Sequence, residues 1–239
     1  MITSKIKIVV TGGSGRFGKN LKIYSKNKYA FPSKRKLNIL SLKSIENYIK
    51  KNKPKIFIHL AGLSRPMSEH DTDIKKSISL NIIGTSNVVI ACSKHKVKLI
   101  YFSTSYVYPG KKGNYKETDP LLPINNYAWS KLGGESAVQM YKNSLILRVS
   151  MTEKPFPHDY AFSDVLTNFI YHKDLAKIFL KLINKKGVIN LGGPSQTVYN
   201  FVRKENPNIR KMKAKNIKGL NFPLNSSMNL KKLKKNLIK

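Results

Sequence analysis

The stretch "KIKIVVTGGSGRFG", residues 5–18, decides the fold, because a short apolar run ends there in four closely spaced glycines. The β-branched run predicts a buried strand, and "RFGKNLKIY", residues 16–24, predicts a helix that begins at the turn. Glycines between a strand and a helix let the backbone reach positive φ, approach a pyrophosphate and pack the helix closely on the strand. The N-terminus of the helix would then present N–H groups to the phosphates. We therefore predict a dinucleotide site here; a glycine-rich turn without a ligand is the alternative.

The rest of the chain alternates strand-like and helix-like segments, which is typical of a parallel sheet covered by helices. Strands are expected at about 29–32, 55–62, 97–105, 144–150 and 187–193, and helices at about 45–52, 73–94, 127–141 and 171–183. Ser41 or Ser44 can cap the first of these helices, and Pro54 marks its end. Residues 153–162 are predicted to form a loop, and the tail beyond Gly192 is short and lysine-rich.

The fold class that follows is an α/β, Rossmann-like, doubly wound parallel sheet with a small C-terminal substrate lobe. We expect a dinucleotide-binding domain over residues 1–150. The substrate lobe is expected over residues 151–239, abbreviated and interleaved with the Rossmann core.

Composition narrows the class of protein further. The chain has 239 residues, 41% of them hydrophobic, which is typical of a globular protein, and no apolar run approaches the roughly 18 residues of a membrane span. The net charge of +33 comes mostly from scattered lysines, without a zinc finger, an RNA-recognition signature or an arginine-rich arm. We therefore expect neither a membrane nor a specific nucleic-acid partner, and attribute weak binding of polyanions to the lysines.

The cysteine and histidine content bears on location and metals. Cys92 is the lone cysteine, which excludes an internal disulfide, and the histidines lack metal-ligand spacing, so no metal is assigned. The N-terminus runs directly into a strand pattern and predicts no cleavable signal peptide. A reducing cytoplasm is the expected location.

The residues after the second expected strand favour NADP over NAD. An NAD site usually has a carboxylate about 20 residues after the glycine turn, where it binds the ribose 2′-hydroxyl. Here the first carboxylate of the chain is Glu46, and the corresponding place holds Ser33, Lys34 and Arg35. Arg16, inside the glycine turn, is a second candidate for the 2′-phosphate. Cations at these positions predict NADPH as the cofactor.

With these segments in order, the sequence resembles the extended short-chain dehydrogenase/reductase family. The segments that carry the resemblance are "TGGSGRFG" (11–18), "IFIHLAG" (56–62), "NIIGTSNVVIAC" (81–92), "FSTSYVY" (102–108), "YAWSK" (127–131), "LILRVS" (145–150) and "FIYHKDLA" (169–176). Within the family, "INLGGP" (189–194) and "FPLNSSMNLKKLKK" (222–235) are most similar to dTDP-4-dehydrorhamnose reductases and related sugar-nucleotide reductases. Two departures are an abbreviated region between Ser150 and Ser163 and a chain shorter than typical members.

The resemblance implies roles for individual residues. It implies that Thr104, Tyr127 and Lys131 are catalytic and that Asn81 holds the central strands in place. The cofactor-binding positions that it implies are Gly12, Gly15, Arg16, Phe17, Gly18, Ser33, Lys34, Arg35, Asn38, Ile39, Leu60, Ala61, Gly62, Ser103, Tyr127 and Lys131. The substrate positions are Ser64, Arg65, Thr104 and His158. A homodimer through the helices around 74–91 and 127–141 is also implied.

The chemistry of reducing a ketone explains why these residue types are needed. Tyr127 and Lys131 are four residues apart, so on a helix they share one face. A free tyrosine has a pKa near ~10, and a neighbouring ammonium lowers that pKa toward the range that is useful for proton transfer. Thr104 ends an expected strand, at the edge of the sheet where doubly wound folds bind ligands, and its hydroxyl can hold the substrate carbonyl oxygen. A turn hydroxyl that bonds nearby backbone is the alternative for Thr104.

Several functional interpretations stay open at this point. The leading one is an NADP-dependent reductase of a nucleotide-linked 4-keto sugar. A sugar-nucleotide epimerase on the same fold, or a non-catalytic dinucleotide-binding regulatory subunit, is the alternative. A dehydratase is disfavoured, because Ser105 stands where dehydration needs a carboxylate beside the hydroxyl residue. His59 lies in an apolar strand and is predicted to be a packed core residue, and Trp129 is predicted to pack on another face of the Tyr127 helix.

Overall fold

The computed structural model describes residues 8–25, 29–217, 219 and 222–238, so the first part of the predicted opening strand, residues 5–7, lies outside the described residues. The central sheet has six strands in the order β10-β5-β4-β3-β1-β2. These strands are β1 (Ile8–Thr11), β2 (Tyr29–Ala30), β3 (Ile56–His59), β4 (Lys98–Thr104), β5 (Ser144–Val149) and β10 (Gly187–Leu191). The strand order reverses between β1 and β3, which makes the sheet doubly wound and confirms the predicted fold class.

Residue contacts divide the chain into two compact units. The first consists of the chain up to Ser103, Ser130–Ile146 and Ile183–Gly187; the second consists of Thr104–Trp129, Leu147–Leu182 and Val188–Lys239.

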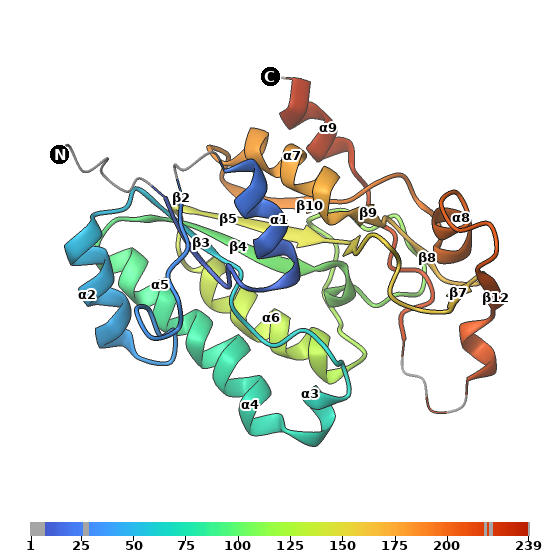
Figure 1. Cartoon of the computed structure of the whole chain (residues 1–239), viewed down its shortest axis with the longest axis horizontal. Helices are drawn as coiled ribbons and strands as arrows, with labels where there is room; N and C mark the ends of the chain where they lie inside the picture. The colour runs from blue at the N-terminus through green and yellow to red at the C-terminus, as the bar shows by residue number, and fades with distance from the viewer. Residues whose placement is uncertain (1–7, 26–28, 218, 220–221, 239) are drawn as a thin grey trace. The chain divides into compact units, whose positions relative to one another are not determined.

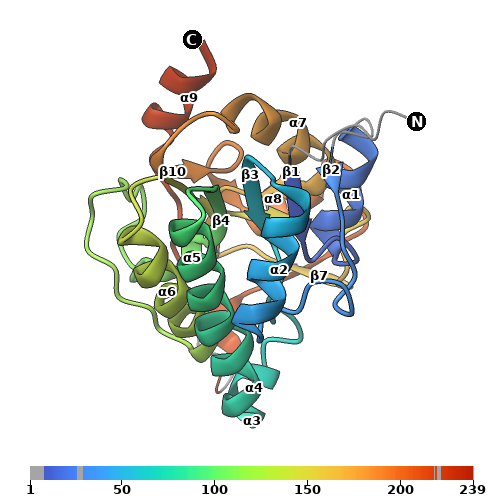
Figure 2. The same cartoon turned by 90° about the vertical axis from the view of Figure 1, so that its left-hand side faces the viewer.

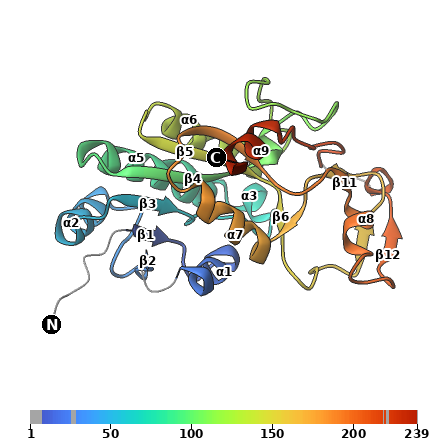
Figure 3. The same ribbon diagram turned by 90° about the horizontal axis from the view of Figure 1, so that it is seen from above.

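In the first unit, β1 pairs in parallel with both β2 and β3, and β3 pairs in parallel with β4. Seen from above, β1, β3 and β4 run side by side (Figure 3). The strands formed where the sequence is β-branched and apolar, and their centres, such as Val10, Phe57 and Ile100, are fully buried. Burial of one such side chain contributes about 1.5–3 kcal/mol.

Helices cover both faces of these strands. They are α1 (Arg16–Tyr24), α2 (Leu42–Asn52), α3 (Glu69–Thr72), α4 (Ile74–Ile78), α5 (Gly84–Lys94) and α6 (Asn126–Gln139). Helices α2 and α5 lie on one face and α1 on the other (Figures 1 and 2). Ser41 caps α2 by accepting a hydrogen bond from the Ser44 amide at 3.2 Å, and α2 ends before Lys53, which has φ of 45°.

The helix predicted over 73–94 contains one irregular turn. Asp73 caps its start by accepting from the Lys76 amide at 2.8 Å. Between α4 and α5, residues Ser79–Ile83 form a π-helix. Such single turns recur at functional sites, because the extra residue re-aims a side chain. Here the side chain in the middle of the turn is Asn81.

The second unit contains short strands and helices. Its elements are β6 (Met151–Thr152), β7 (Tyr160–Phe162), β8 (Leu166–Thr167), β9 (Ile170–Tyr171), α7 (His172–Leu182), β11 (Gln196–Thr197), α8 (Val198–Val202), β12 (Arg210–Met212) and α9 (Lys231–Ile238). The pairs β6–β9 and β7–β12 are parallel, and β8–β11 is antiparallel. The loop predicted over 153–162 is therefore wrong at its end, where β7 forms. Alternation explains β7, because Ala161 is buried while Tyr160 and Phe162 are half-buried.

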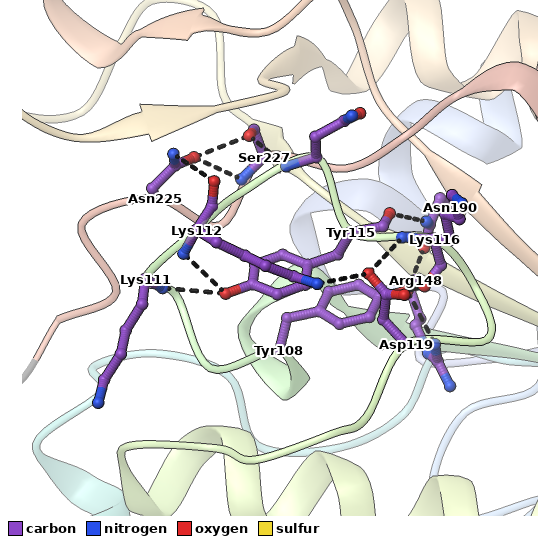
Figure 4. Close-up of polar contacts among 11 residues, drawn as sticks. Tyr108, Lys111, Lys112, Tyr115, Lys116, Asp119, Arg148, Asn190, Asn225 and Ser227 are labelled. Atoms are coloured by element: carbon purple, nitrogen blue, oxygen red, sulfur yellow. Dashed lines mark hydrogen bonds and ion pairs between the residues drawn. The ribbon is translucent and has the colours of Figure 1, made fainter.

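A buried polar cluster fixes the segment that follows β4 (Figure 4). The rings of Tyr108 and Tyr115 stack with centroids 4.8 Å apart. Arg148, only 2% exposed, donates to the Tyr108 hydroxyl at 2.8 Å and to the Glu117 carbonyl oxygen at 3.0 Å. Asn190 Nδ2 donates to the Tyr115 carbonyl oxygen at 2.9 Å. A buried cation is tolerated when it is bonded in this way, so the cluster anchors the loop to β5 and β10 within the second unit.

Among the described residues, no helix is both long enough and apolar enough to cross a membrane.

Candidate active site

The glycine turn between β1 and α1 has room for backbone only. Gly12 has φ of +74°, and a Cβ there would lie 2.6 Å from the amide nitrogen of Ala61 and 2.7 Å from the carbonyl carbon of Leu60. A Cβ on Gly18 would collide with the carbonyl oxygen of Gly12. Gly15 caps α1 and donates its N–H to that same oxygen at 3.0 Å. The turn therefore has the close backbone approach and the open helix N-terminus that a pyrophosphate needs.

The segment predicted to select the cofactor forms an exposed turn after β2. The Ser33 carbonyl oxygen accepts from the amides of Lys36 at 2.9 Å and Leu37 at 3.0 Å. Lys34 and Arg35 are exposed on this turn. A cavity of about 370 Å³ opens beside it and is lined by Ala30, Phe31, Pro32, Ser33, Lys36 and Tyr48. Two cations on an exposed turn are better suited to bind the charged 2′-phosphate of NADP than the uncharged ribose 2′-hydroxyl of NAD.

The next part of the chain connects this turn to α2 and α5. Asn38 Oδ1 accepts from the Leu40 amide at 3.1 Å, which fixes the backbone at Asn38 and Ile39, two predicted cofactor-binding positions. The Ile39 carbonyl oxygen accepts from Asn87 Nδ2 at 3.0 Å, and its side chain lies against Gly84.

Asn81 holds the loop after β3. Its Oδ1 accepts from the Leu63 amide at 2.7 Å, while its Nδ2 donates to the Leu63 carbonyl oxygen at 2.9 Å and to Ser130 Oγ at 2.8 Å. A Cβ on Gly62 would lie 2.7 Å from Asn81 Oδ1. The π-helix thus places one buried amide where it joins the loop after β3 to α6. The resemblance implied a role of this kind, and these contacts give it a physical form.

A buried hydrogen-bonded chain runs through His59. Thr85 Oγ1 donates to the Asn81 carbonyl oxygen at 2.7 Å, so His59 Nε2 must donate to Thr85 Oγ1, at 3.1 Å. His59 Nδ1 then accepts from Thr11 Oγ1 at 2.9 Å. Burial, together with the smaller effect of the Lys131 charge, lowers the pKa of His59 to about 3, so this histidine is neutral. The prediction of a packed core histidine is confirmed.

Thr104 is the last residue of β4 and is 5% exposed. Its Oγ1 accepts from the Tyr106 amide at 3.3 Å, so the hydroxyl caps the short 3₁₀ turn Ser105–Val107. This is the local bond that was the alternative for Thr104. The hydroxyl still has a proton to donate, so the bond leaves a second role open to it.

Tyr127 and Lys131 both lie on α6, so the helix that their spacing of four residues required is present. The Tyr127 ring meets the edge of Tyr106 with centroids 6.2 Å apart. Lys131 Nζ lies 4.2 Å from the centroid of the Tyr101 ring, and the Tyr101 hydroxyl donates to the Lys131 carbonyl oxygen at 3.0 Å. Burial of its ammonium lowers the pKa of Lys131 to about 7, against the charge of Glu135, which raises it.

Small residues bring α6 close to the π-helix in the first unit. A Cβ on Gly133 would lie 2.8 Å from Ile82 Cδ1, and one on Gly134 would collide with the Asn81 carbonyl oxygen. Trp129 is 49% exposed in the single chain. It lies on a helix through which a homodimer is implied, so its packing at such an interface stays a prediction.

One buried acid on α6 was missed by sequence reasoning. Glu135 is fully buried, and Ser103 Oγ donates to its Oε2 at 2.5 Å. Ser103, predicted to contact cofactor, therefore directs its hydroxyl to this carboxylate. The spacing of four residues from Lys131 was the available signal, but nothing local shows that this face of the helix is buried.

An aromatic row in the second unit was also missed. Neighbouring rings of the row have centroids 5.2–6.4 Å apart, and the row begins with Tyr127 and Tyr106 at 6.2 Å. The further contacts are Tyr106–Phe222 at 5.2 Å, Phe222–Phe162 at 6.0 Å, Phe162–Tyr160 at 5.5 Å, Tyr160–His158 at 6.4 Å and His158–Phe156 at 5.3 Å. The row thus connects Tyr127 with His158, a predicted substrate residue.

The other two predicted substrate residues follow β3. Ser64 is exposed, and Arg65 is half-buried before a cis peptide bond to Pro66. Within the described part of the chain, no group of three or more histidine, cysteine or acidic side chains could hold a metal ion.

Known proteins resemble this chain in sequence and in fold. Residues 6–162 match the family model described as the RmlD substrate binding domain. A dTDP-4-dehydrorhamnose reductase of Aggregatibacter actinomycetemcomitans is 26% identical over 200 residues, covering 79% of this chain and 63% of that protein. The methionine adenosyltransferase 2 subunit beta of Pongo abelii is 29% identical over 143 residues, covering 55% of this chain and 42% of that protein. The chain thus spans less than two thirds of the length of these relatives.

A crystal structure of dTDP-4-dehydrorhamnose reductase from Bacillus anthracis, in complex with NADP, superposes with a TM-score of 0.86 at 23% identity. The superposition covers 97% of this chain and 93% of that one, and it shows that the fold is shared over nearly all of the described structure. The family match spans the glycine turn, β3, the π-helix and α6, which are among the segments that carried the resemblance. The chain therefore belongs to the RmlD substrate binding domain family, within the extended short-chain dehydrogenases/reductases.

Proposed function

We propose that the chain is an NADP-dependent reductase of a nucleotide-linked 4-keto sugar, similar to dTDP-4-dehydrorhamnose reductase. The observation that carries the proposal is Lys131, a desolvated lysine with a pKa of about 7, one helical turn after Tyr127. Perturbed titratable groups of this kind cluster at functional sites. The likeness to a reductase of Aggregatibacter actinomycetemcomitans supports the choice of substrate.

NADP fits the residues of the first unit. The cradle at Gly12 and Gly18 excludes side chains, and the first turn of α1 can receive the pyrophosphate. Lys34 and Arg35 would bind the 2′-phosphate, and Leu60, Ala61 and Gly62 would lie along the cofactor. Bound NADPH would supply a hydride to the keto carbon.

The protein's own part in the reaction is to hold and protonate the carbonyl oxygen. Thr104 Oγ1 would donate to that oxygen, and the Tyr127 hydroxyl would deliver the proton that turns the developing alkoxide into an alcohol. The Lys131 ammonium would lower the pKa of Tyr127 and bind the nicotinamide ribose. Residues 151–239 would form the substrate lobe, and the aromatic row from Tyr127 to Phe156 would offer flat apolar surface to the nucleotide-linked sugar.

Two other functions are distinguishable from this one. An epimerase would interconvert sugars without net consumption of NADPH. The likeness to a methionine adenosyltransferase subunit raises the second possibility, a dinucleotide-binding regulatory subunit.

The test is NADPH oxidation, followed by absorbance, against a panel of nucleotide-linked keto sugars. We expect turnover with a dTDP-linked 4-keto sugar and a lower KM for NADPH than for NADH. NADPH binding without turnover on any member of the panel would point to the regulatory subunit.

We also propose a homodimer, because α4, the π-helix and α5 expose a stripe of isoleucines. Ile74, Ile78, Ile83 and Ile90 are 41–56% exposed. Their successive spacings of four, five and seven residues keep them on one face, with the five falling over the π-turn. Replacing Ile78 and Ile83 by Lys should convert the dimer to a monomer in light scattering, while Ile23→Lys, an exposed isoleucine on α1, should not. A wild-type chain that is monomeric at micromolar concentration would refute the dimer.

A further inference from the structure

Helix α6 carries a third functional side chain besides Tyr127 and Lys131. Glu135 follows Lys131 by four residues, so the two side chains share a face of the helix. Glu135 is 0% exposed, although an isolated carboxylate is costly to bury. A fully buried acid one turn from a half-buried lysine calls for a physical reason.

The carboxylate of Glu135 is held as an acceptor. Its Oε2 accepts from Ser103 Oγ at 2.5 Å, and its Oε1 accepts from Gln139 Nε2 at 3.4 Å. These two bonds hold both oxygens of the carboxyl group against polar side chains of β4 and α6. Ser103 is 2% exposed and lies on β4, so the acid is fixed to the sheet and cannot turn to solvent.

Lys131 meets titratable and charged groups from each element packed around it. Burial lowers the pKa of His59 of β3 and of His70 of α3, and the charge of Lys131 lowers both further. At His70 the charges of Asp71 and Glu69 oppose this effect. Both histidines are therefore neutral above pH 7 and cannot compensate an ammonium. Tyr101 of β4 offers its ring face at 4.2 Å. The negative charge that acts on Lys131 comes from Glu135, and it opposes the effect of burial.

We propose that Glu135 is a positioning residue that increases the protonated fraction of Lys131 near neutral pH, with Ser103 holding the carboxylate in place. The proposal rests on the proposed function for its consequence in catalysis, because Lys131 must be an ammonium to activate Tyr127. Its physical content, the coupling of Glu135 to Lys131, does not depend on the reaction. Ser103 thus acts through Glu135 on Lys131.

The first experiment measures the protonation of Lys131 directly. The full-length chain, without added cofactor, is labelled with acetic anhydride across pH 5–10, and the reactivity of Lys131 is read by peptide mass spectrometry. In Glu135→Gln the pKa of Lys131 should fall by about one unit, because a neighbouring opposite charge shifts a pKa by about 1–3 units. The matched control is Glu46→Gln, which removes the same charge from α2, where Glu46 pairs with Lys94, and should leave Lys131 unchanged.

The second experiment reads the same coupling in catalysis. As the pH rises, kcat/KM should fall with a midpoint at the pKa of Lys131 in the free enzyme. Glu135→Gln should therefore lose about 10-fold relative to wild type at pH 8 and less than about two-fold at pH 5.5, as a one-unit shift from a pKa of about 7 requires. Lys131→Arg should abolish the difference, since a guanidinium does not titrate in this range.

Ser103→Ala keeps the test decisive if Glu135→Gln does not fold, and it should shift the pKa of Lys131 in the same direction. An unchanged Lys131 pKa in Glu135→Gln, or in Ser103→Ala where that is the folded variant, would overturn the proposal. A shifted pKa in a protein without reductase activity would leave the coupling standing and refute the proposed function instead.

Discussion

Replacing Tyr127 by Phe is expected to lower kcat by about 10²–10⁴-fold, the usual contribution of a positioned general acid. The substitution removes the hydroxyl that protonates the alkoxide and keeps the ring, whose edge contact with Tyr106 has a centroid distance of 6.2 Å. The glycine turn is untouched, so the dissociation constant of NADPH should stay within about two-fold.

The measurement compares steady-state turnover with NADPH binding followed by fluorescence. Tyr199→Phe is the matched control, because it removes the same hydroxyl from α8, where the ring contacts Arg203 and Lys211. Its turnover should equal that of wild type. A Tyr127→Phe variant that is as active as wild type would eliminate Tyr127 as the acid.

Replacing Gly12 by Ala is expected to weaken NADPH binding strongly and to destabilise the fold. The new Cβ would lie 2.6 Å from the Ala61 amide nitrogen, and backbone on both sides leaves nothing flexible to move. Overpacking of this kind costs about 1–3 kcal/mol in the free energy of unfolding, and the left-handed φ of +74° costs about 1–2 kcal/mol more. A shift of about 1 Å in the cradle should weaken NADPH affinity by roughly 10²-fold.

Gly187→Ala separates the effect of the steric clash from the effect of the left-handed φ. Gly187 also has a positive φ, of +81°, but a Cβ there would meet no atom within 4 Å. This control should show the strain alone in urea denaturation and should bind NADPH normally. NADPH binding by Gly12→Ala at wild-type affinity would mean that the turn is not the pyrophosphate cradle.

Much of the fold could be predicted because its signals are local. The glycines at 12–18 and the β-branched run before them define β1 and α1, and the apolar runs at 55–62 and 97–105 define β3 and β4. The prediction that Tyr127 and Lys131 share one face required only that the segment containing them is helical. These features depend on neighbours within a few residues in the chain.

The features that were missed depend on partners distant in sequence. Burial of Glu135 is set by Ser103, 32 residues away, and no local pattern distinguishes this acid from a surface acid. The strand β7 gains its ladder from β12, where Tyr160 pairs with Arg210. The π-turn around Asn81 is stabilised by contacts with Leu63 and Ser130 rather than by its own sequence.

The most direct test of the central claim follows the hydride itself. The wild-type protein is incubated with dTDP-4-dehydrorhamnose and NADPH that is deuterated at C4 of the nicotinamide, and the sugar product is analysed by mass spectrometry and NMR. We predict one deuterium at C4 of the reduced sugar, with one NADPH consumed for each sugar. A sugar that is unchanged, or is epimerised without deuterium and without loss of NADPH, would contradict the assignment as a reductase.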